Sequence, residues 1–231
     1  MNSLNPGKGA ITKRSKFPLA PERVTRRASF KFARCLLLFV FLCKKNFVTD
    51  IVSSNNPVPA APGIFFLIGF MGSGKSHWGK IWAEAEQYSF VDLDELIEQK
   101  EGKSIAGIFE YKGEDYFRKI EAAALRDCEG LENTIIACGG GTPCFYDNMQ
   151  WMNAQGTTIY IVCTIAEILQ RVLADKEKRP LLKKRSDAEL LFFIEQKLNE
   201  RLPFYSLAQA TVQSALLNAS SFPGIILNTK L

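Results

Sequence analysis

A run of eight residues, Gly69-Phe-Met-Gly-Ser-Gly-Lys-Ser76, fits the phosphate-binding pattern G-x-x-x-x-G-K-[ST]. Its glycines allow a tight turn, so that backbone N–H groups and the start of the following helix point at phosphate oxygens. Lys75 would reach the β- and γ-phosphates, and the Ser76 hydroxyl would ligate Mg²⁺. The pattern predicts a nucleotide site; the alternative is a glycine-rich turn that binds nothing. The residues expected to contact the nucleotide are Gly72, Ser73, Gly74, Lys75, Ser76 and His77.

His77 is the only histidine of the chain and directly follows this loop. A lone histidine beside a nucleotide suggests a general base, but phosphoryl transfer depends chiefly on positioning and charge neutralisation. Because His77 falls in the first turn of the predicted helix, we interpret it as a residue near the nucleotide and not as a base.

Two carboxylates, Asp92 and Asp94, follow the second apolar run of the domain. Side chains separated by one residue in an extended chain point the same way, and the carboxyl end of a strand is where α/β sheets bind ligands. One carboxylate could lie near the metal while the other receives a substrate hydroxyl. The alternative is an aspartate that caps the following helix, a role that for Asp94 could coexist with function.

The elements that must position these residues alternate between short apolar runs and helical stretches. Near-continuous apolar strands separated by helices predict a parallel sheet covered on both faces, a three-layer α/β/α fold. The predicted strands are Gly63–Ile68, Tyr88–Asp92, Thr134–Cys138, Thr157–Cys163 and Thr211–Gln213. The predicted helices are Ser76–Gln87, Gly113–Cys128, Asp147–Gln155, Ile165–Ala174 and Asp187–Tyr205.

Charge and cysteine content exclude several classes of protein. Residues 1–50 hold eleven Lys or Arg against Glu22 and Asp50, while the rest of the chain is slightly acidic. The basic excess therefore belongs to the N-terminal segment, and we do not expect the folded part to bind nucleic acid. The six cysteines form no C-x-x-C pair, which excludes the usual zinc-site spacings. Cys138 and Cys163 fall in strand-like runs and are expected to be buried, reduced thiols.

We divide the chain into three parts. Residues 1–62 read as a basic, disordered extension, with an organelle-targeting or secretory segment and a membrane-surface anchor as alternatives. The apolar run Cys35–Cys43 is well short of the ~20 residues needed to span a bilayer. Residues 63–213 form the predicted domain, and residues 214–231 form a tail that is a poor helix former because of Pro223 and Gly224.

Six motifs occur in the order seen in shikimate kinases, so the stretch from about Phe65 to Val212 resembles that family. They are Gly-Phe-Met-Gly-Ser-Gly-Lys-Ser76, Asp-Leu-Asp94, Gly-Glu-Asp-Tyr-Phe-Arg118, Cys-Gly-Gly-Gly-Thr142, Lys-Arg179-Pro-Leu-Leu and Asn-Glu-Arg201-Leu-Pro-Phe-Tyr205. The resemblance implies a P-loop kinase fold with a central parallel sheet and a mobile lid. It also implies transfer of phosphate from ATP to the 3-hydroxyl of shikimate, giving shikimate 3-phosphate and ADP.

The resemblance implies a role for each acceptor-side residue. Arg118 and Arg201 would hold the shikimate carboxylate, which suits the planar guanidinium fork. Asp94 would bind the ring hydroxyls and orient or deprotonate the attacking one, and Asp92 would support Mg²⁺, roles that could be partly exchanged. The glycine turn formed by Gly139, Gly140 and Gly141 would let the backbone approach the substrate; the alternative is a turn with a structural role alone.

Residues 175–186 are rich in Lys and Arg and lie between two predicted helices. The resemblance implies a lid that closes over ATP and excludes water, with Arg179 contacting the phosphates. The alternative is a solvated charged loop. Together with Lys75 and Asp94, Arg179 completes the predicted catalytic set.

Three rival functions stay open at this point. Another P-loop metabolite kinase, acting on gluconate or a nucleoside, would share the loop and lid but should not need both Arg118 and Arg201. A non-catalytic relative would keep the fold without turnover, and a membrane-surface protein would use the basic N-terminal segment. The favoured interpretation is a monomeric shikimate kinase without stable membrane association, in the cytoplasm or, if residues 1–62 are a transit peptide, in a plastid.

Overall fold

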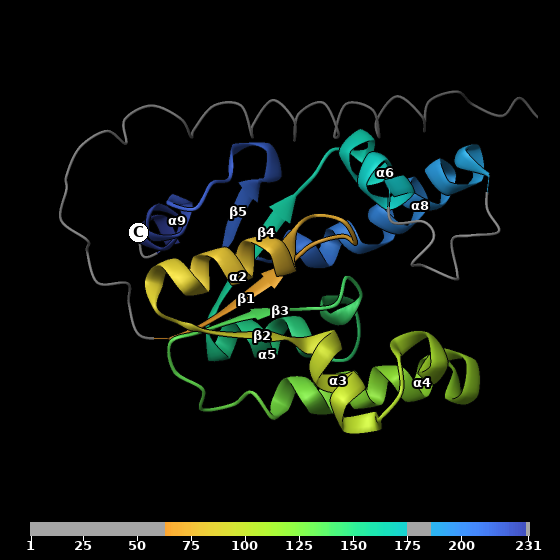
Figure 1. The fold of residues 1–231 in the computed structure, drawn as a ribbon, viewed down its shortest axis with the longest axis horizontal. Helices are drawn as coiled ribbons and strands as arrows, with labels where there is room; N and C mark the ends of the chain where they lie inside the picture. Colours follow the sequence, from red (N-terminus) through yellow and green to blue (C-terminus); the bar gives the residue numbers. More distant parts are fainter. Residues whose placement is uncertain (1–62, 175–185, 230–231) are drawn as a thin grey trace, which may run out of the picture. The chain divides into compact units, whose positions relative to one another are not determined.

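The computed structural model describes residues 63–174 and 186–229, and the predicted N-terminal extension and all of the predicted lid except Ser186 lie outside these ranges. A five-stranded parallel sheet has the order β2-β3-β1-β4-β5 and runs through the centre of Figure 1. The strands are β1 (Ile64–Ile68), β2 (Ser89–Asp92), β3 (Thr134–Ala137), β4 (Thr157–Val162) and β5 (Ala210–Gln213). The helices are α2 (Lys75–Glu86), α3 (Leu93–Glu101), α4 (Ile105–Arg126), α5 (Asn148–Gln155), α6 (Ile165–Ala174), α8 (Asp187–Tyr205) and α9 (Ser221–Thr229), with short 3₁₀ turns η1 (Thr142–Cys144) and η3 (Ser214–Leu216).

The central strand β1 divides the core into two faces. Phe66 and its alternate neighbours pack in one cluster with side chains of α3, α4, α5 and α8, whereas Phe65 and Leu67 pack in another with side chains of α2 and α9. Side chains alternate across a strand, so a fully apolar strand such as β1 must be covered on both sides. The predicted three-layer α/β/α architecture is confirmed, and each predicted strand is present with its ends displaced by no more than one residue.

Helix α4 begins earlier than the sequence indicated. It starts at Ile105, behind the N-cap Ser104, whose hydroxyl accepts a hydrogen bond from the N–H of Gly107. Gly113, taken as the helix start, is instead a kink inside it with φ 79° and ψ 176°. Glycine tolerates this left-handed value, so the helix bends there and brings the segment before the kink against α3, beside which α4 lies in Figure 1.

The C-terminal tail also differs from the expectation of poor helix formation. Residues 221–229 form α9, and Phe222, Ile225 and Ile226 are buried against the α2 face. Pro223 lies in the first turn, where its missing N–H would have no partner within the helix in any case. Trp82 of α2 donates a hydrogen bond of 2.9 Å to the carbonyl of Asn218, which ties the segment before α9 to the domain.

Within the part of the chain that the structure describes, none of the helices combines the length and apolar character needed to cross a membrane. The described cysteines are free thiols, and Cys138 and Cys163 are buried as expected. Burial raises the pKa of the Cys138 thiol well above its usual value, which keeps it protonated.

Candidate active site

The predicted phosphate-binding loop joins β1 to α2, as the motif requires. Gly69 has φ 143°, and a Cβ there would lie 2.7 Å from the carbonyl oxygen of Ile161. Gly74, the N-cap of α2, has φ 95°. A side chain at Gly69 would clash with the nearby backbone, and a side chain at Gly74 would strain the backbone conformation. The loop therefore turns tightly and presents the N-terminus of α2 to a ligand.

Lys75 lies across its own loop. Its ammonium donates hydrogen bonds to the carbonyls of Gly69 at 2.8 Å and Phe70 at 3.0 Å. Burial lowers the pKa of Lys75 to about 8, and the opposing charge of Asp94 limits that fall. The ammonium is thus partly desolvated and held beside the loop, where a phosphate could replace the two carbonyls as its partner.

Ser76 and Asp92 meet between α2 and the end of β2. The Ser76 hydroxyl donates to Asp92 Oδ2 at 2.5 Å, while Asp92 Oδ1 accepts from the N–H groups of Asp94 and Glu95 and so caps α3. A hydroxyl and a carboxylate oxygen side by side are the hard donors that Mg²⁺ prefers, so this pair fits the ion. The capping role considered for Asp94 belongs to Asp92.

Asp94 points into the same region, though from a helix and not from an extended strand as expected. The chain turns helical at Leu93, directly after Asp92. Among the described residues, the buried Oδ1 of Asp94 has no hydrogen-bond partner. Burial raises its pKa to about 6, and the charges of Asp92 and Glu121 add to the shift. A buried acceptor without a donor is costly, and a substrate hydroxyl would satisfy it.

Arg118 is buried and held by two carboxylates. Its Nη1 donates to Glu121 at 2.8 Å, and its Nε and Nη2 donate to Glu114 at 3.2 and 2.9 Å. Its guanidinium carbon lies 4.2 Å from the ring centroid of Phe145. These contacts fix the plane of the guanidinium before any ligand binds.

Close contacts around the glycine turn bring the predicted acceptor residues together. A Cβ on Gly139 would lie 2.8 Å from Glu121 and 3.1 Å from Asp94 Oδ1. On Gly141 it would lie 2.7 Å from Arg118. On Gly140 it would lie 3.1 Å from Arg201 and 3.4 Å from Gly69 and Met71 of the phosphate loop. Each glycine therefore leaves room for a different functional group, and the middle one faces the nucleotide side. The structure thus gathers Asp94, Arg118 and Arg201 around one turn.

Two buried residues next to this turn were not among the site residues predicted from the sequence. Glu121 is fully buried, and its Oε1 accepts a hydrogen bond of 2.6 Å from Thr142. Tyr205, also fully buried, donates to the carbonyl of Gly140 at 2.5 Å. The available signals were helical spacings: Glu121 follows Arg118 by three residues and Tyr205 follows Arg201 by four.

A hollow of about 340 Å³ opens at the start of α2 and is lined by Gly74, His77, Trp78, Arg171 and Ser214. Arg171 spans it, donating to the carbonyl of Gly72 at 2.9 Å and to the Ser214 hydroxyl at 3.0 Å. His77 is exposed and its ring centroid lies 4.9 Å from that of Trp78. His77 lies beside the phosphate loop, and its contact with a nucleotide stays a prediction. Arg171 and Ser214 line the same hollow and join the candidate site, although the sequence did not indicate them.

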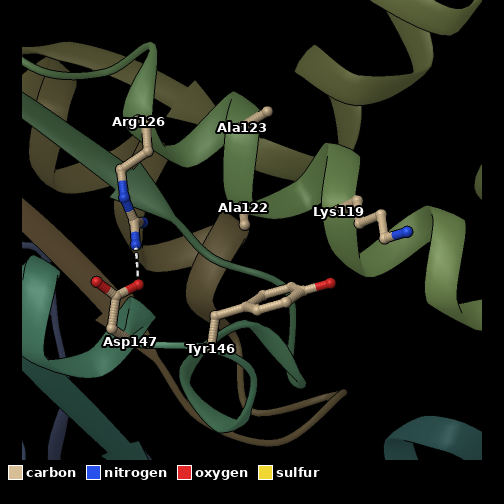
Figure 2. A pocket seen from close by; sticks show the side chains of 6 residues that line it. All are labelled: Lys119, Ala122, Ala123, Arg126, Tyr146 and Asp147. Atoms are coloured by element: carbon tan, nitrogen blue, oxygen red, sulfur yellow. Dashed lines mark hydrogen bonds and ion pairs between the residues drawn. The ribbon is translucent and has the colours of Figure 1, made fainter.

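A separate hollow of about 380 Å³ lies between α4 and the segment after η1 (Figure 2). Tyr146 borders it, and Arg126 is occupied there by an ion pair with Asp147 at 2.5 Å. None of the predicted site residues lines this hollow, so it is distinct from the candidate active site. Arg179, the remaining predicted site residue, lies outside the described residues.

The family model and two curated relatives name the same family. The family model "Shikimate kinase" matches residues 71–225. The shikimate kinase of Parabacteroides distasonis is 44% identical over 146 residues, which cover 63% of this chain and 84% of that protein. That of Phocaeicola vulgatus is 42% identical over 144 residues, covering 62% of this chain and 82% of the relative.

Two solved structures of shikimate kinases also resemble this chain. The crystal structure of shikimate kinase from Bacteroides thetaiotaomicron superposes with a TM-score of 0.66 at 36% identity, covering 73% of this chain and 94% of the other. That of shikimate kinase from Acinetobacter baumannii in complex with shikimate gives 0.63 at 31% identity, covering 72% and 91%. The P-loop, the glycine turn with its two arginines and these matches together show that this chain belongs to the shikimate kinase family.

Proposed function

We propose that this chain transfers the γ-phosphoryl group of ATP to the 3-hydroxyl of shikimate and releases ADP and shikimate 3-phosphate. The observation that carries the proposal is the glycine turn, which borders Arg118 and Arg201 on one side and the phosphate loop on the other. Two guanidinium groups suit an acceptor that bears a carboxylate. The unpaired oxygen of Asp94 suits one that also bears hydroxyl groups.

Shikimate carries both groups, and it is the ligand of the Acinetobacter baumannii relative. In the proposed complex the carboxylate lies against Arg118 and Arg201, and a ring hydroxyl donates to Asp94. With a pKa of about 6, Asp94 is ionised at neutral pH and can accept the hydroxyl proton. The hydroxyl oxygen then bonds to the γ-phosphorus, the bond from that phosphorus to the bridging oxygen breaks, and ADP leaves.

On the nucleotide side, the backbone of Gly72, Ser73 and Gly74 and the ammonium of Lys75 would hold the phosphates. Ser76 and Asp92 would hold Mg²⁺, which would neutralise charge on the β- and γ-phosphate oxygens. Arg179 is proposed to contact the phosphates from the segment between α6 and α8. His77, Arg171 and Ser214 would border the rest of the nucleotide. The enzyme is proposed to act as a monomer and without a nucleic-acid partner.

Product identification tests this assignment. The purified protein is incubated with Mg²⁺ and ATP, together with shikimate or gluconate, and followed by ³¹P NMR. A new phosphomonoester signal with shikimate and none with gluconate is expected. A phosphomonoester formed from gluconate, or none formed from shikimate, would overturn the choice of acceptor.

A further inference from the structure

Tyr205 touches the acceptor site without being one of the residues proposed to bind a substrate. It closes α8, is fully buried, and its hydroxyl donates a hydrogen bond of 2.5 Å to the carbonyl of Gly140. Arg201, one helical turn earlier, lies beside the same glycine, because a Cβ on Gly140 would lie 3.1 Å from the Nη1 of Arg201. A phenolic hydroxyl can donate one hydrogen bond and accept others, so it can join the glycine turn to the arginine.

The hydrogen bond to the carbonyl of Gly140 fixes the orientation of the whole peptide group between Gly140 and Gly141. A peptide group is planar, so fixing the carbonyl of Gly140 also fixes the direction of the N–H of Gly141. Gly140 has no side chain to limit its backbone, and it lies between Arg201 and the phosphate loop. Without an anchor, this peptide could rotate at the point where acceptor and nucleotide meet.

The ring of Tyr205 is held independently of its hydroxyl. It packs against Tyr160 of β4 with ring centroids 4.9 Å apart and planes inclined at 32°, inside the core cluster that covers this face of the sheet. Removing the hydroxyl alone should therefore leave the ring in place.

We propose that Tyr205 is a positioning residue for the acceptor: its hydroxyl, bonded to Gly140 and facing Arg201, holds the glycine turn and the arginine in the geometry that receives shikimate. This inference rests on the proposed function and extends it to a residue that touches neither substrate. It predicts an effect on acceptor binding and not on nucleotide binding.

Steady-state kinetics of Tyr205→Phe test the proposal, with Tyr160→Phe as the matched control that removes a hydroxyl from the neighbouring ring. Tyr205→Phe should raise KM for shikimate about tenfold, the equivalent of about 1.4 kcal/mol, with KM for ATP changed less than about twofold. Tyr160→Phe should leave both constants near those of the unaltered protein. An unchanged shikimate KM, an equal rise in both constants, or the same effect in the control would overturn the proposal.

A second variant keeps the test decisive if Tyr205→Phe does not fold. p-Aminophenylalanine at position 205 retains a hydrogen-bond donor at the same place on the ring and should restore the shikimate KM. If Tyr205→Phe folds, an equal rise of the shikimate KM in the p-aminophenylalanine variant would count against the proposal. If Tyr205→Phe does not fold, a rise of about tenfold in the p-aminophenylalanine variant would do so. If the unaltered protein turns over shikimate but Tyr205→Phe does not differ from it, only the role of Tyr205 fails. If the unaltered protein does not turn over shikimate, the proposed function fails and this inference falls with it.

Discussion

The hydroxyl of Thr142 donates a hydrogen bond of 2.6 Å to one oxygen of the buried carboxylate of Glu121, whose other oxygen accepts from Arg118 at 2.8 Å. Thr142 directly follows the glycine turn, while Glu121 and Arg118 lie on α4. The turn and the helix are therefore joined through one buried carboxylate. Both oxygens of this buried carboxylate therefore have donors, as burial of a polar group requires.

Thr142→Val should lower the free energy of unfolding by about 1 to 3 kcal/mol, because Glu121 Oε1 would stay buried without a donor. Urea unfolding followed by circular dichroism measures the change. Thr211→Val, on the exposed side of β5, is the control and should stay within about 0.5 kcal/mol of the unaltered protein. Equal stability of the two variants would show that the hydrogen bond contributes nothing.

Arg201→Ala should weaken shikimate binding roughly ten- to hundredfold, since charge-assisted hydrogen bonds contribute about 1.5 to 3 kcal/mol. KM for ATP should change little. Lys119→Ala, at the hollow of Figure 2, removes an exposed basic side chain of the same domain and should leave both constants unaltered. Arg201 is a better residue to test than Arg118, because removal of Arg118 would leave the buried Glu121 without its ion pair and destabilise the fold. An Arg201→Ala enzyme with an unaltered shikimate KM would contradict the proposed carboxylate contact.

Asp94→Asn should separate stability from activity. The folded pKa of about 6 lies above the ordinary value of 3.8, so the stability of the unaltered protein is greatest below pH 4 with respect to this group and falls as pH rises through 6. Asn cannot ionise, so at pH 8 the free energy of unfolding of the variant should exceed that of the unaltered protein by at most about 3 kcal/mol. At pH 4 the two proteins should be equally stable. Thermal unfolding at the two pH values measures the difference.

In the unaltered enzyme, kcat/KM for shikimate should fall below pH 6 as Asp94 becomes protonated. A pH-independent stability difference would argue against a buried, ionised Asp94.

Much of this arrangement follows from local sequence. The loop from Gly69 to Ser76 has a pattern whose residue types are set by the turn that binds phosphate, and apolar runs bounded by polar residues located the strands to within one residue. Asp92 and Asp94 follow β2 as predicted, but the prediction that both lie in an extended chain was wrong. Both lie at the strand end, but Asp92 caps α3, so the chain is already helical at Asp94. The point at which a strand becomes a helix depends on such tertiary contacts, including the Ser76 bond to Asp92.

Buried polar residues were the harder part. In the helical pattern, Glu121 looks like an ordinary surface charge and Tyr205 like an ordinary core aromatic. Only the fold places them against the glycine turn. The start of α4 was also missed because Gly113 looked like a helix boundary. A glycine can equally be a kink, and which of the two it is depends on whether helix continues on both sides.

The C-terminal helix provides a separate test of the fold. Phe222→Ala should lower the free energy of unfolding by about 3 to 5 kcal/mol, because its ring is fully buried against Trp82 and Phe65. Leu227→Ala, on the exposed side of the same helix, should cost much less. Denaturant unfolding of both variants decides the matter, and similar values would mean that α9 does not pack on the domain.

The most direct test of the central claim is ADP release by the purified protein with Mg²⁺ and ATP, measured with shikimate, with its methyl ester and with neither. If Arg118 and Arg201 bind the acceptor carboxylate, shikimate should stimulate turnover strongly and the uncharged ester should do so at least about tenfold less well. Turnover that is independent of shikimate, or equal for acid and ester, would contradict the account.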